Sequence, residues 1–373
     1  KYPERYYFGQ PRVPCTFLDS KDYVYGSKDK LEETLHFLNE NVPFDLLVVI
    51  NSPGASLIGD DLKGIVNECI GEKEFIVIET SGFSQDICKG YEKATGELLK
   101  QLDILRLKKL PDMVNILGIS IFHRDYLGDI EEIQRLLQMC GIKVNCFLCS
   151  KSSLEDIRNI SKASLNIVIN PEYGYNTALL LEEIYDIPYY ICDGPPIGFT
   201  ATEKFIGDIC NILNKDSSKF MEESERARAA AYIHISRVNS MTGLPKGVNF
   251  ALEGTYSEIY SYVLFLVNYF GMILETVSIL NENTDIFKGK MENLLKDLNI
   301  HDSINRDIVR TKSELVFGNG NTIAKLKLKK HDFSGIEISL PSLGYIDVIP
   351  KTRLGLKGGL MIVEQVLNGL IFV

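Results

Sequence analysis

The chain has 373 residues, of which 45% are hydrophobic and 24% are charged, and its formal net charge is −10. This length predicts two or three domains with several buried cores, because one domain usually holds roughly 100–200 residues. The negative charge, with no basic tract, argues against electrostatic binding to nucleic acid or to an anionic membrane.

Membrane and redox signals in the sequence point to a cytoplasmic protein. The longest apolar run, Tyr262 to Phe270, is interrupted by Asn268 and is too short to span a bilayer. Eight cysteines in a chain of this size are typical of reduced thiols rather than of a disulfide scaffold. The chain starts at Lys1 with sequence typical of the middle of a domain, so we expect further residues upstream.

The first part of the chain alternates short apolar runs with loops rich in glycine and serine. An apolar strand is expected over Phe44 to Ile50, followed by the loop Ser52 to Asp61. A second strand is expected over Phe75 to Ile78. Charged residues and a helix breaker at Lys108 to Pro111 predict the end of this first unit.

The middle of the chain has the pattern of a Rossmann-like series, in which buried strands alternate with amphipathic helices. We expect strands over Val114–Ser120, Lys143–Leu148, Leu165–Ile169 and Pro188–Cys192, and helices over Gly128–Cys140, from Ser152, over Ala178–Tyr185 and from Thr200.

The last part begins with a long helix over Lys219 to Arg237, which we expect to connect two domains. A strand over Val248 to Leu252 opens the final unit, and an amphipathic helix over Gly358 to Leu370 closes it. The sequence therefore predicts an α/β protein with parallel sheets in three Rossmann-like domains. These domains are expected over residues 1–109, 110–215 and 216–373.

Several motifs together resemble one known family. The loop Ser52-Pro53-Gly54-Ala55-Ser56-Leu57-Ile58-Gly59-Asp60-Asp61 is followed by Glu79-Thr80-Ser81-Gly82-Phe83 and by Gly90-Tyr91-Glu92. Further matches are Pro195-Pro196-Ile197-Gly198, Phe250-Ala251-Leu252-Glu253-Gly254 and Gly355-Leu356-Lys357-Gly358-Gly359. This pattern resembles the nitrogenase component 1 family of oxidoreductases, and the resemblance covers nearly the whole chain.

The resemblance implies a fold, a cofactor and partners. It implies three Rossmann-like domains around a central cleft, paired as a homodimer or with a homologous component 1 subunit. It also implies electron delivery by an ATP-dependent iron protein and an iron–sulfur cluster bound near the first-domain loop. In this chain that loop comprises Ser52, Pro53, Gly54 and Ser56.

Metal ligands expected from the family are missing at the matching positions of this chain. Thiolate sulfur is the ligand that iron–sulfur clusters require, but the cluster cysteine is matched here by Pro53 or Ser52. The family's cofactor cysteine is matched by Asn170, and no histidine occurs between Gly335 and Gly359. We therefore identify no metal site in the sequence, and reduction of dinitrogen on the known cofactor is disfavoured.

The cysteines of the middle unit have two interpretations. The spacing of Cys140, Cys146 and Cys149 superficially resembles a metal site. Because Cys146 and Cys149 are three residues apart on or just after a strand, their side chains should point to opposite faces, and buried thiols are the favoured interpretation. Cys192 ends a parallel strand, where doubly wound folds bind ligands, so it has a functional as well as a structural interpretation.

Polar side chains follow the carboxyl ends of three expected strands of the middle unit. Asn170, Cys192 and Asp193 follow two of these strands, and His123 and Arg124 follow another. Rossmann-like sheets collect ligands at this edge, so we expect a small organic molecule or anion to bind here, with Asn170 and Arg124 orienting it. In the alternative interpretation these side chains satisfy turn backbone or pair with one another.

Three other polar segments have a structural interpretation that we favour over a functional one. Asp60 and Asp61 are expected to cap a helix rather than to act as an acid–base pair. Ser81 and Ser84 are likewise expected to belong to a cap. The segment Gly318 to Thr322 lacks the lysine of a P-loop, and a strand-to-helix turn explains it.

The sequence thus predicts a nitrogenase-like oxidoreductase component that accepts electrons from an ATP-dependent iron protein and reduces an unidentified substrate. The alternative is a non-catalytic scaffold, or a partner subunit that has lost its metal clusters.

Overall fold

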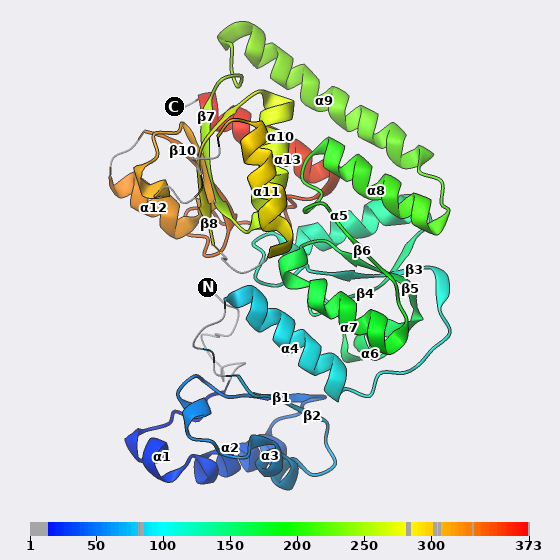
Figure 1. Ribbon diagram of the computed structural model, residues 1–373, viewed down its shortest axis with the longest axis vertical. Coiled ribbons are helices and arrows are strands. Elements are labelled where there is room, and N and C mark those ends of the chain that lie inside the picture. The colour runs from blue at the N-terminus through cyan, green and yellow to red at the C-terminus, as the bar shows by residue number, and fades with distance from the viewer. Residues whose placement is uncertain are drawn as a thin grey trace. The chain divides into compact units, whose positions relative to one another are not determined.

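The computed structural model describes residues 14–80, 82, 86–280, 285–300, 304, 307–329 and 332–371. The chain divides into two compact units, unit 1 with residues 1–104 and unit 2 with residues 105–373. Within the described residues, unit 1 contains one parallel sheet and unit 2 contains two (Figure 1).

Unit 1 is built on two parallel strands, β1 (Leu47–Ile50) and β2 (Phe75–Ile78). On β1 every second side chain is exposed, so Val48 and Ile50 face away from the core. Helices α2 and α3 form the core with the inward side of the sheet, and α4 packs on β2. The helical elements of this unit are α1 (Ser20–Tyr25), α2 (Lys28–Asn41), the 3-10 turn η1 (Ala55–Leu57), α3 (Leu62–Ile70) and α4 (Ile87–Gln101).

The first sheet of unit 2 has the strand order β4-β3-β5-β6 with every pair parallel. Its central strands are buried because helices cover both faces: α5 and α8 lie on one side and α6 and α7 on the other (Figure 1). The elements are β3 (Leu110–Leu117), α5 (Tyr126–Met139), β4 (Lys143–Phe147), α6 (Leu154–Arg158), η2 (Ile160–Lys162), β5 (Ala163–Val168), η3 (Pro171–Tyr173), α7 (Tyr175–Tyr185), β6 (Tyr189–Ile191) and α8 (Phe199–Leu213).

The second sheet of unit 2 has the order β10-β9-β7-β8 and is also parallel. Helix α12 covers one face, whereas α10 and α13 pack on the other (Figure 1). The elements are β7 (Asn249–Gly254), α10 (Tyr256–Phe270), β8 (Ile273–Ile279), α11 (Asp285–Asp297), η5 (Ile308–Arg310), β9 (Leu315–Asn319), α12 (Gly320–Leu328) and β10 (Ser334–Ser339).

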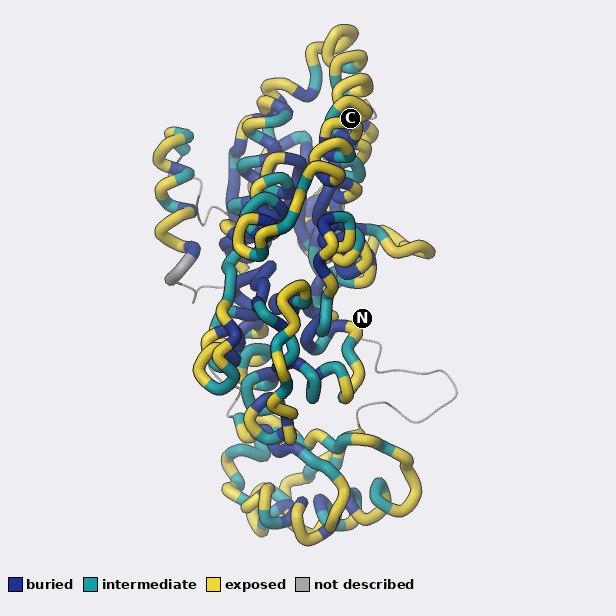
Figure 2. The backbone as a smooth tube through the Cα atoms, turned by 90° about the vertical axis from the view of Figure 1, so that its right-hand side faces the viewer, coloured by how far each residue is buried: buried dark blue, intermediate teal, exposed yellow. Residues whose placement is uncertain are grey.

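Unit 2 has two layers, each a sheet with its covering helices, and two long helices join them. Helix α9 (Ser218–Thr242) follows the first sheet, and α13 (Gly355–Ile371) packs against α5, α8 and α9 as well as against β9 and β10. One continuous apolar core therefore contains residues from both sheets, such as Ile116 and Phe250, and from α13, such as Val366. Burial is concentrated on the strands, and the outer helices carry the exposed residues (Figure 2).

The prediction of an α/β fold with parallel sheets is confirmed. The domain boundaries expected near residues 109 and 215 remain predictions, while the two compact units divide between Ile104 and Leu105. No helix in the described part of the chain combines the length and the apolar character needed to cross a bilayer.

Some local expectations were wrong in detail. β3 starts at Leu110 rather than at Val114, because Pro111 lies in the exposed beginning of the strand, where a missing N–H is tolerated. The cap of α6 is Ser153, not Ser152: its hydroxyl accepts from the Asp156 N–H. Helix α9 extends to Thr242, beyond the expected end at Arg237.

The structure confirms the helix cap predicted for Asp61 and the strand-to-helix turn at Gly318 to Thr322, but Asp60 does not cap α3. Asp61 caps α3 by accepting from the Gly64 N–H at 3.0 Å. Asp60 instead accepts from the Ser27 N–H and hydroxyl at 2.8 and 2.6 Å, so the pair has two separate structural roles. Asn319 caps α12 at the strand-to-helix turn. Ser81 and Ser84 lie outside the described residues.

Candidate functional site

The five candidate residues of the middle sheet all lie at the carboxyl edge of β3, β5 and β6, but they fall into two groups. His123, Arg124 and Asn170 lie after β3 and β5, and of these Arg124 takes part in a buried polar junction between the two layers of unit 2. Cys192 and Asp193 line a separate cavity beside β6. No described contact joins the two groups directly.

His123 is buried in the loop after β3. Its Nδ1 accepts from the Ser120 N–H at 3.0 Å, so the proton of the neutral ring is on Nε2. The ring lies edge-on to Tyr173, with the two centroids 4.8 Å apart. Nε2 has no hydrogen-bond partner among the described residues. Burial lowers the pKa of this imidazole to about 4, so it is neutral at physiological pH.

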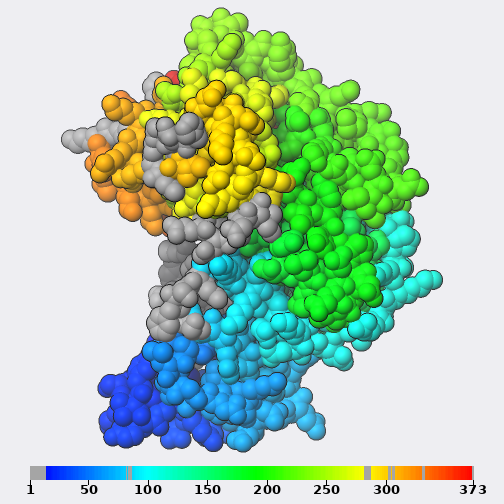
Figure 3. Space-filling view, in the orientation of Figure 1, coloured from blue at the N-terminus to red at the C-terminus, as the bar shows by residue number. Residues whose placement is uncertain are grey.

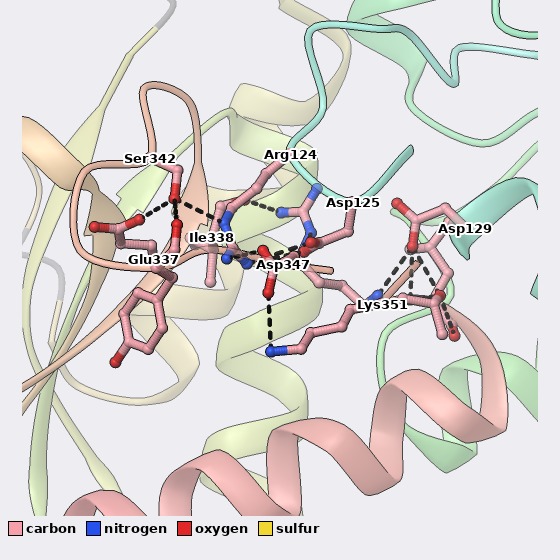
Figure 4. A network of polar contacts seen from close by, with 12 residues as sticks. Arg124, Asp125, Asp129, Glu337, Ile338, Ser342, Asp347 and Lys351 are labelled. Carbon is pink, nitrogen blue, oxygen red and sulfur yellow. Dashed lines mark hydrogen bonds and ion pairs between the residues drawn. The ribbon is translucent and has the colours of Figure 1, made fainter. Parts of the chain in front are cut away.

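Arg124 connects the loop after β3 with the segment that follows β10 (Figure 4). Its guanidinium lies 3.2 Å from Asp125, pairs with Asp347 and donates to Ser342. Its centre lies 5.7 Å from the Tyr345 ring, close enough for a cation–π contact. The cation is therefore already fully paired within the protein.

Asn170 closes the turn between β5 and η3. Its side-chain amide donates to the Gly118 carbonyl at 2.7 Å, which ties the end of β5 to the end of β3. Gly118 has φ +80°, and a Cβ there would overlap with the backbone of Asn170. The two strand ends are thus held in close backbone contact.

A second buried cation, Arg353, lies in the same junction and was not predicted. Its guanidinium lies 3.4 Å from Asp125 and 3.6 Å from Glu258, and it donates to the Ile338 carbonyl. No motif marked it, because its partners come from segments far away in the sequence. The sequence feature that could have indicated Arg353 is a single arginine just before an apolar helix.

Asp129 of α5 fixes the same segment (Figure 4). One of its carboxylate oxygens accepts from the Thr352 hydroxyl at 2.8 Å and from the N–H groups of Arg353 and Leu354 at 2.9 and 3.3 Å. Burial raises the pKa of Asp129 to about 6, against the opposing effect of Arg353. The junction is therefore a dense set of paired buried charges.

The cavity beside β6 has a volume of about 390 Å³. Cys192, at the end of the strand, is 3% exposed, and burial raises the pKa of its thiol. Asp193 is half exposed and pairs with Lys290 at 2.6 Å and Lys204 at 3.2 Å. The hydrogen bond from Lys290, together with that from Lys204, lowers the pKa of Asp193.

Comparison with known proteins decides the family. The sequence pattern of the family described as nitrogenase component 1 type oxidoreductase matches residues 4–371. The chain belongs to this family. A solved structure, nitrogenase Cp1 at pH 6.5, superimposes with a TM-score of 0.79 at 17% identity, covering 95% of this chain and 82% of that one.

The chain is also similar to subunits of light-independent protochlorophyllide reductases. A light-independent protochlorophyllide reductase subunit of Staurastrum punctulatum is 28% identical over 216 residues, which are 54% of this chain and 41% of the relative. The corresponding subunit of Chlorokybus atmophyticus is 24% identical over 287 residues, or 66% and 56% of the two chains. This chain therefore spans about half the length of the curated relatives it matches.

The first-domain loop, where the nitrogenase component 1 resemblance implied a nearby cluster, satisfies its own polar groups. The Ser52 hydroxyl accepts from the Ala55 N–H at 3.3 Å, and the Ser56 hydroxyl donates to the Pro53 carbonyl at 2.7 Å. Gly54 lies against the ring of Tyr23. The loop offers hydroxyl groups but no thiol to a metal.

The described residues do not fit an iron–sulfur cluster. Such a cluster needs several thiolates, but no three His, Cys, Asp or Glu side chains of the described chain are grouped to hold a metal ion. Burial raises the pKa of the Cys140, Cys146 and Cys149 thiols. For Cys140 and for Cys149 the pKa is about 12. These groups remain protonated thiols, in keeping with a packing role.

Replacing His123 with asparagine should remove a loss of stability in acid. Because the folded pKa of His123 is near 4 and the unfolded value is near 6.5, the unfolded chain binds a proton first as the pH falls. The wild type should lose about 2 kcal/mol between pH 8 and pH 5 through this group. The Oδ1 of asparagine can still accept from Ser120 but does not titrate.

Urea unfolding at both pH values measures this difference. Asp129 contributes in the opposite direction between about pH 4 and pH 6, so the comparison is made between wild type and variant. His234→Asn, on the exposed side of α9, is the control and should change nothing. An equal loss in wild type and His123→Asn would show that His123 does not cause it.

Proposed function

We propose that this chain is a component of a nitrogenase-like reductase, accepts electrons from an ATP-dependent iron protein and reduces a substrate not yet identified. The match of residues 4–371 to the nitrogenase component 1 family carries this proposal. The protochlorophyllide reductase relatives support a reductase that acts on an organic molecule. Eight cysteines without a disulfide support a cytoplasmic location.

We place the substrate at the carboxyl edge of β3, β5 and β6. Cys192 and Asp193 line a cavity there, and His123, Arg124 and Asn170 follow the neighbouring strands. Asn170 and Arg124 already contact protein groups. A substrate would therefore either replace those contacts or bind against the backbone that the two side chains hold in place. Ligand-induced thermal shift in Asn170→Leu and Arg124→Ala variants distinguishes this from a purely structural role.

A second copy of the chain or a homologous subunit is the proposed partner at the first-domain loop. Val48, Ile50 and Leu57, which are 43%, 57% and 75% exposed, flank Ser52 to Ser56 in the chain. Large exposed apolar side chains near one loop are typical of a surface that a partner covers.

The side chains that could bind a metal in the described part of the chain favour a second candidate function. Hydroxyl groups at the first-domain loop and protonated, scattered thiols elsewhere suit a non-catalytic subunit or scaffold that supports a cluster-bearing partner. In that case the chain would contribute to the assembly without binding a cluster itself.

One preparation separates the two candidates. The tagged full-length protein would be isolated anaerobically from its own host with a non-hydrolysable ATP analogue, and iron, acid-labile sulfide and bound proteins would be measured. We expect a complex that contains iron, sulfide and an iron protein, and ATP-dependent electron transfer to it. A complex that shows no ATP-dependent electron transfer, and from which the separated chain carries neither iron nor sulfide, would contradict the reductase and support the scaffold.

A further inference from the structure

The cavity beside β6 has mainly apolar walls. Figure 3 shows the yellow part of the chain, which includes α10 and α11, beside the green part, which includes α7 and α8. The cavity of about 390 Å³ is lined by residues of α8 and α10. Ala201 and Phe205 of α8 line one side, and Leu264, Phe265 and Tyr269 of α10 line the other. Its volume is at the lower end of the roughly 300–1,000 Å³ typical of small-molecule sites.

The cavity is preformed because glycines bring its walls together. A side chain at Gly198 would overlap with the ring of Phe265, and one at Gly194 would overlap with the Ser261 hydroxyl. Both glycines have positive φ, at +80° and +123°, so the connection from β6 to α8 requires them. The floor of the cavity is therefore fixed by backbone packed directly against α10, and little ordering is needed on binding.

The charged groups at the cavity neutralise one another. Asp193 pairs with Lys290 and Lys204, and Lys204 also lies 2.7 Å from Asp208, which accepts from the Tyr190 hydroxyl. Two cations thus face two anions. An anionic or cationic ligand would have to break one of these pairs, whereas a neutral ligand would leave them intact.

The remaining polar groups are uncharged. The Cys192 thiol is a weak donor in its protonated form. Ser261 and Asn268 contribute a hydroxyl and an amide to the lining. An apolar cavity with a few neutral polar groups recognises a flat apolar body and orients it by hydrogen bonds.

We propose that this cavity binds a neutral, predominantly apolar ring compound. The inference deepens the proposed function, because Cys192 and Asp193 lie at the edge of the sheet where we place the substrate. Only the role of the ligand as a substrate rests on the proposed function; binding of the ligand does not. Aromatic side chains such as Phe265 and Tyr269 would contact the faces or edges of the rings.

Binding of the fluorescent amine 1-aminoanthracene to the full-length protein tests the proposal. This probe is neutral at pH 7.5 and consists of fused rings, and it emits more strongly in apolar surroundings. We expect saturable binding with a micromolar Kd and at least tenfold weaker binding of anthracene-1-sulfonate, which carries a charge on a similar ring system. Comparable or tighter binding of the sulfonate, or no saturable binding of the amine, would overturn the proposal.

Cavity-filling variants locate the bound probe. Ala201→Phe fills the cavity from α8 and Leu264→Trp fills it from α10, and each should weaken binding at least tenfold. Ala229→Phe, on an exposed position of α9, is the matched control and should bind like the wild type. Thermal unfolding verifies that each variant is folded.

The outcomes also separate this inference from the proposed function. Unchanged binding in both folded filling variants would place the probe elsewhere and refute the site, while electron transfer in the anaerobic complex could still be observed. Binding at the cavity without iron or electron transfer would retain the ligand site and reject the reductase.

Discussion

Replacing Arg353 with methionine should lower the free energy of unfolding by about 3–5 kcal/mol, the loss typical of removing one partner from a buried ion pair. Arg353 is 5% exposed and lies between Asp125 and Glu258. Methionine fills much of the same volume but leaves Glu258 buried without a counter-charge, Asp125 with Arg124 alone and the Ile338 carbonyl without its donor. Urea unfolding should show a lower midpoint with an unchanged m-value.

Arg310→Met is the matched control. The side chain of Arg310 is 84% exposed and lies 3.4 Å from Asp307, so its removal should change stability by less than about 0.5 kcal/mol. Equal midpoints for the two variants would mean that the buried pairs of Arg353 contribute nothing to stability.

The second large effect is expected from Gly128→Ala, which should cost about 3 kcal/mol, at the upper end for an overpacked site. A Cβ on this residue of α5 would overlap with the Lys351 carbonyl and would lie 3.1 Å from the Thr352 nitrogen. Both neighbours are backbone atoms of the segment that Asp129 holds, so no side-chain rotation can relieve the contact. Thermal unfolding should show a lower midpoint.

Gly207→Ala in α8 provides the comparison. A Cβ there meets no atom within 4 Å, so alanine should stabilise the helix by about 0.5–1 kcal/mol. If Gly128→Ala were as stable as Gly207→Ala, the close approach of α5 to residues 351–352 would not exist in solution.

Most of the fold could be predicted from the sequence, because the signals for strands and helix caps lie within the segments themselves. Runs such as Phe75 to Ile78 are apolar enough to identify buried parallel strands, and caps such as Asp61 lie beside the helix they begin. The same locality explains the boundary errors. Pro111 was interpreted as a breaker, yet at the exposed start of β3 it costs no hydrogen bond.

The candidate site was predictable only in part. The rule that ligands bind at the carboxyl ends of strands led to Cys192 and Asp193, which do line a cavity. The rule could not separate them from His123 and Arg124. The surroundings of Arg124 depend on residues more than 200 positions away, such as Asp347. Arg353 and Asp129 were missed for the same reason, since neither pairs with a neighbour in sequence that would mark it.

The position of α13 also determines the order in which unit 2 can be completed during synthesis. The helix packs on α5, α8 and α9 of one layer and on β9 and β10 of the other, yet it leaves the ribosome after all of them. Until then the nascent chain exposes the apolar side chains that later contact Ile362, Val366 and Leu370. Domains form from the N-terminus as synthesis proceeds, and exposed apolar surface of this kind attracts chaperones. The junction of paired buried charges, whose Arg353 lies two residues before α13, therefore forms only after both layers of unit 2 have left the ribosome.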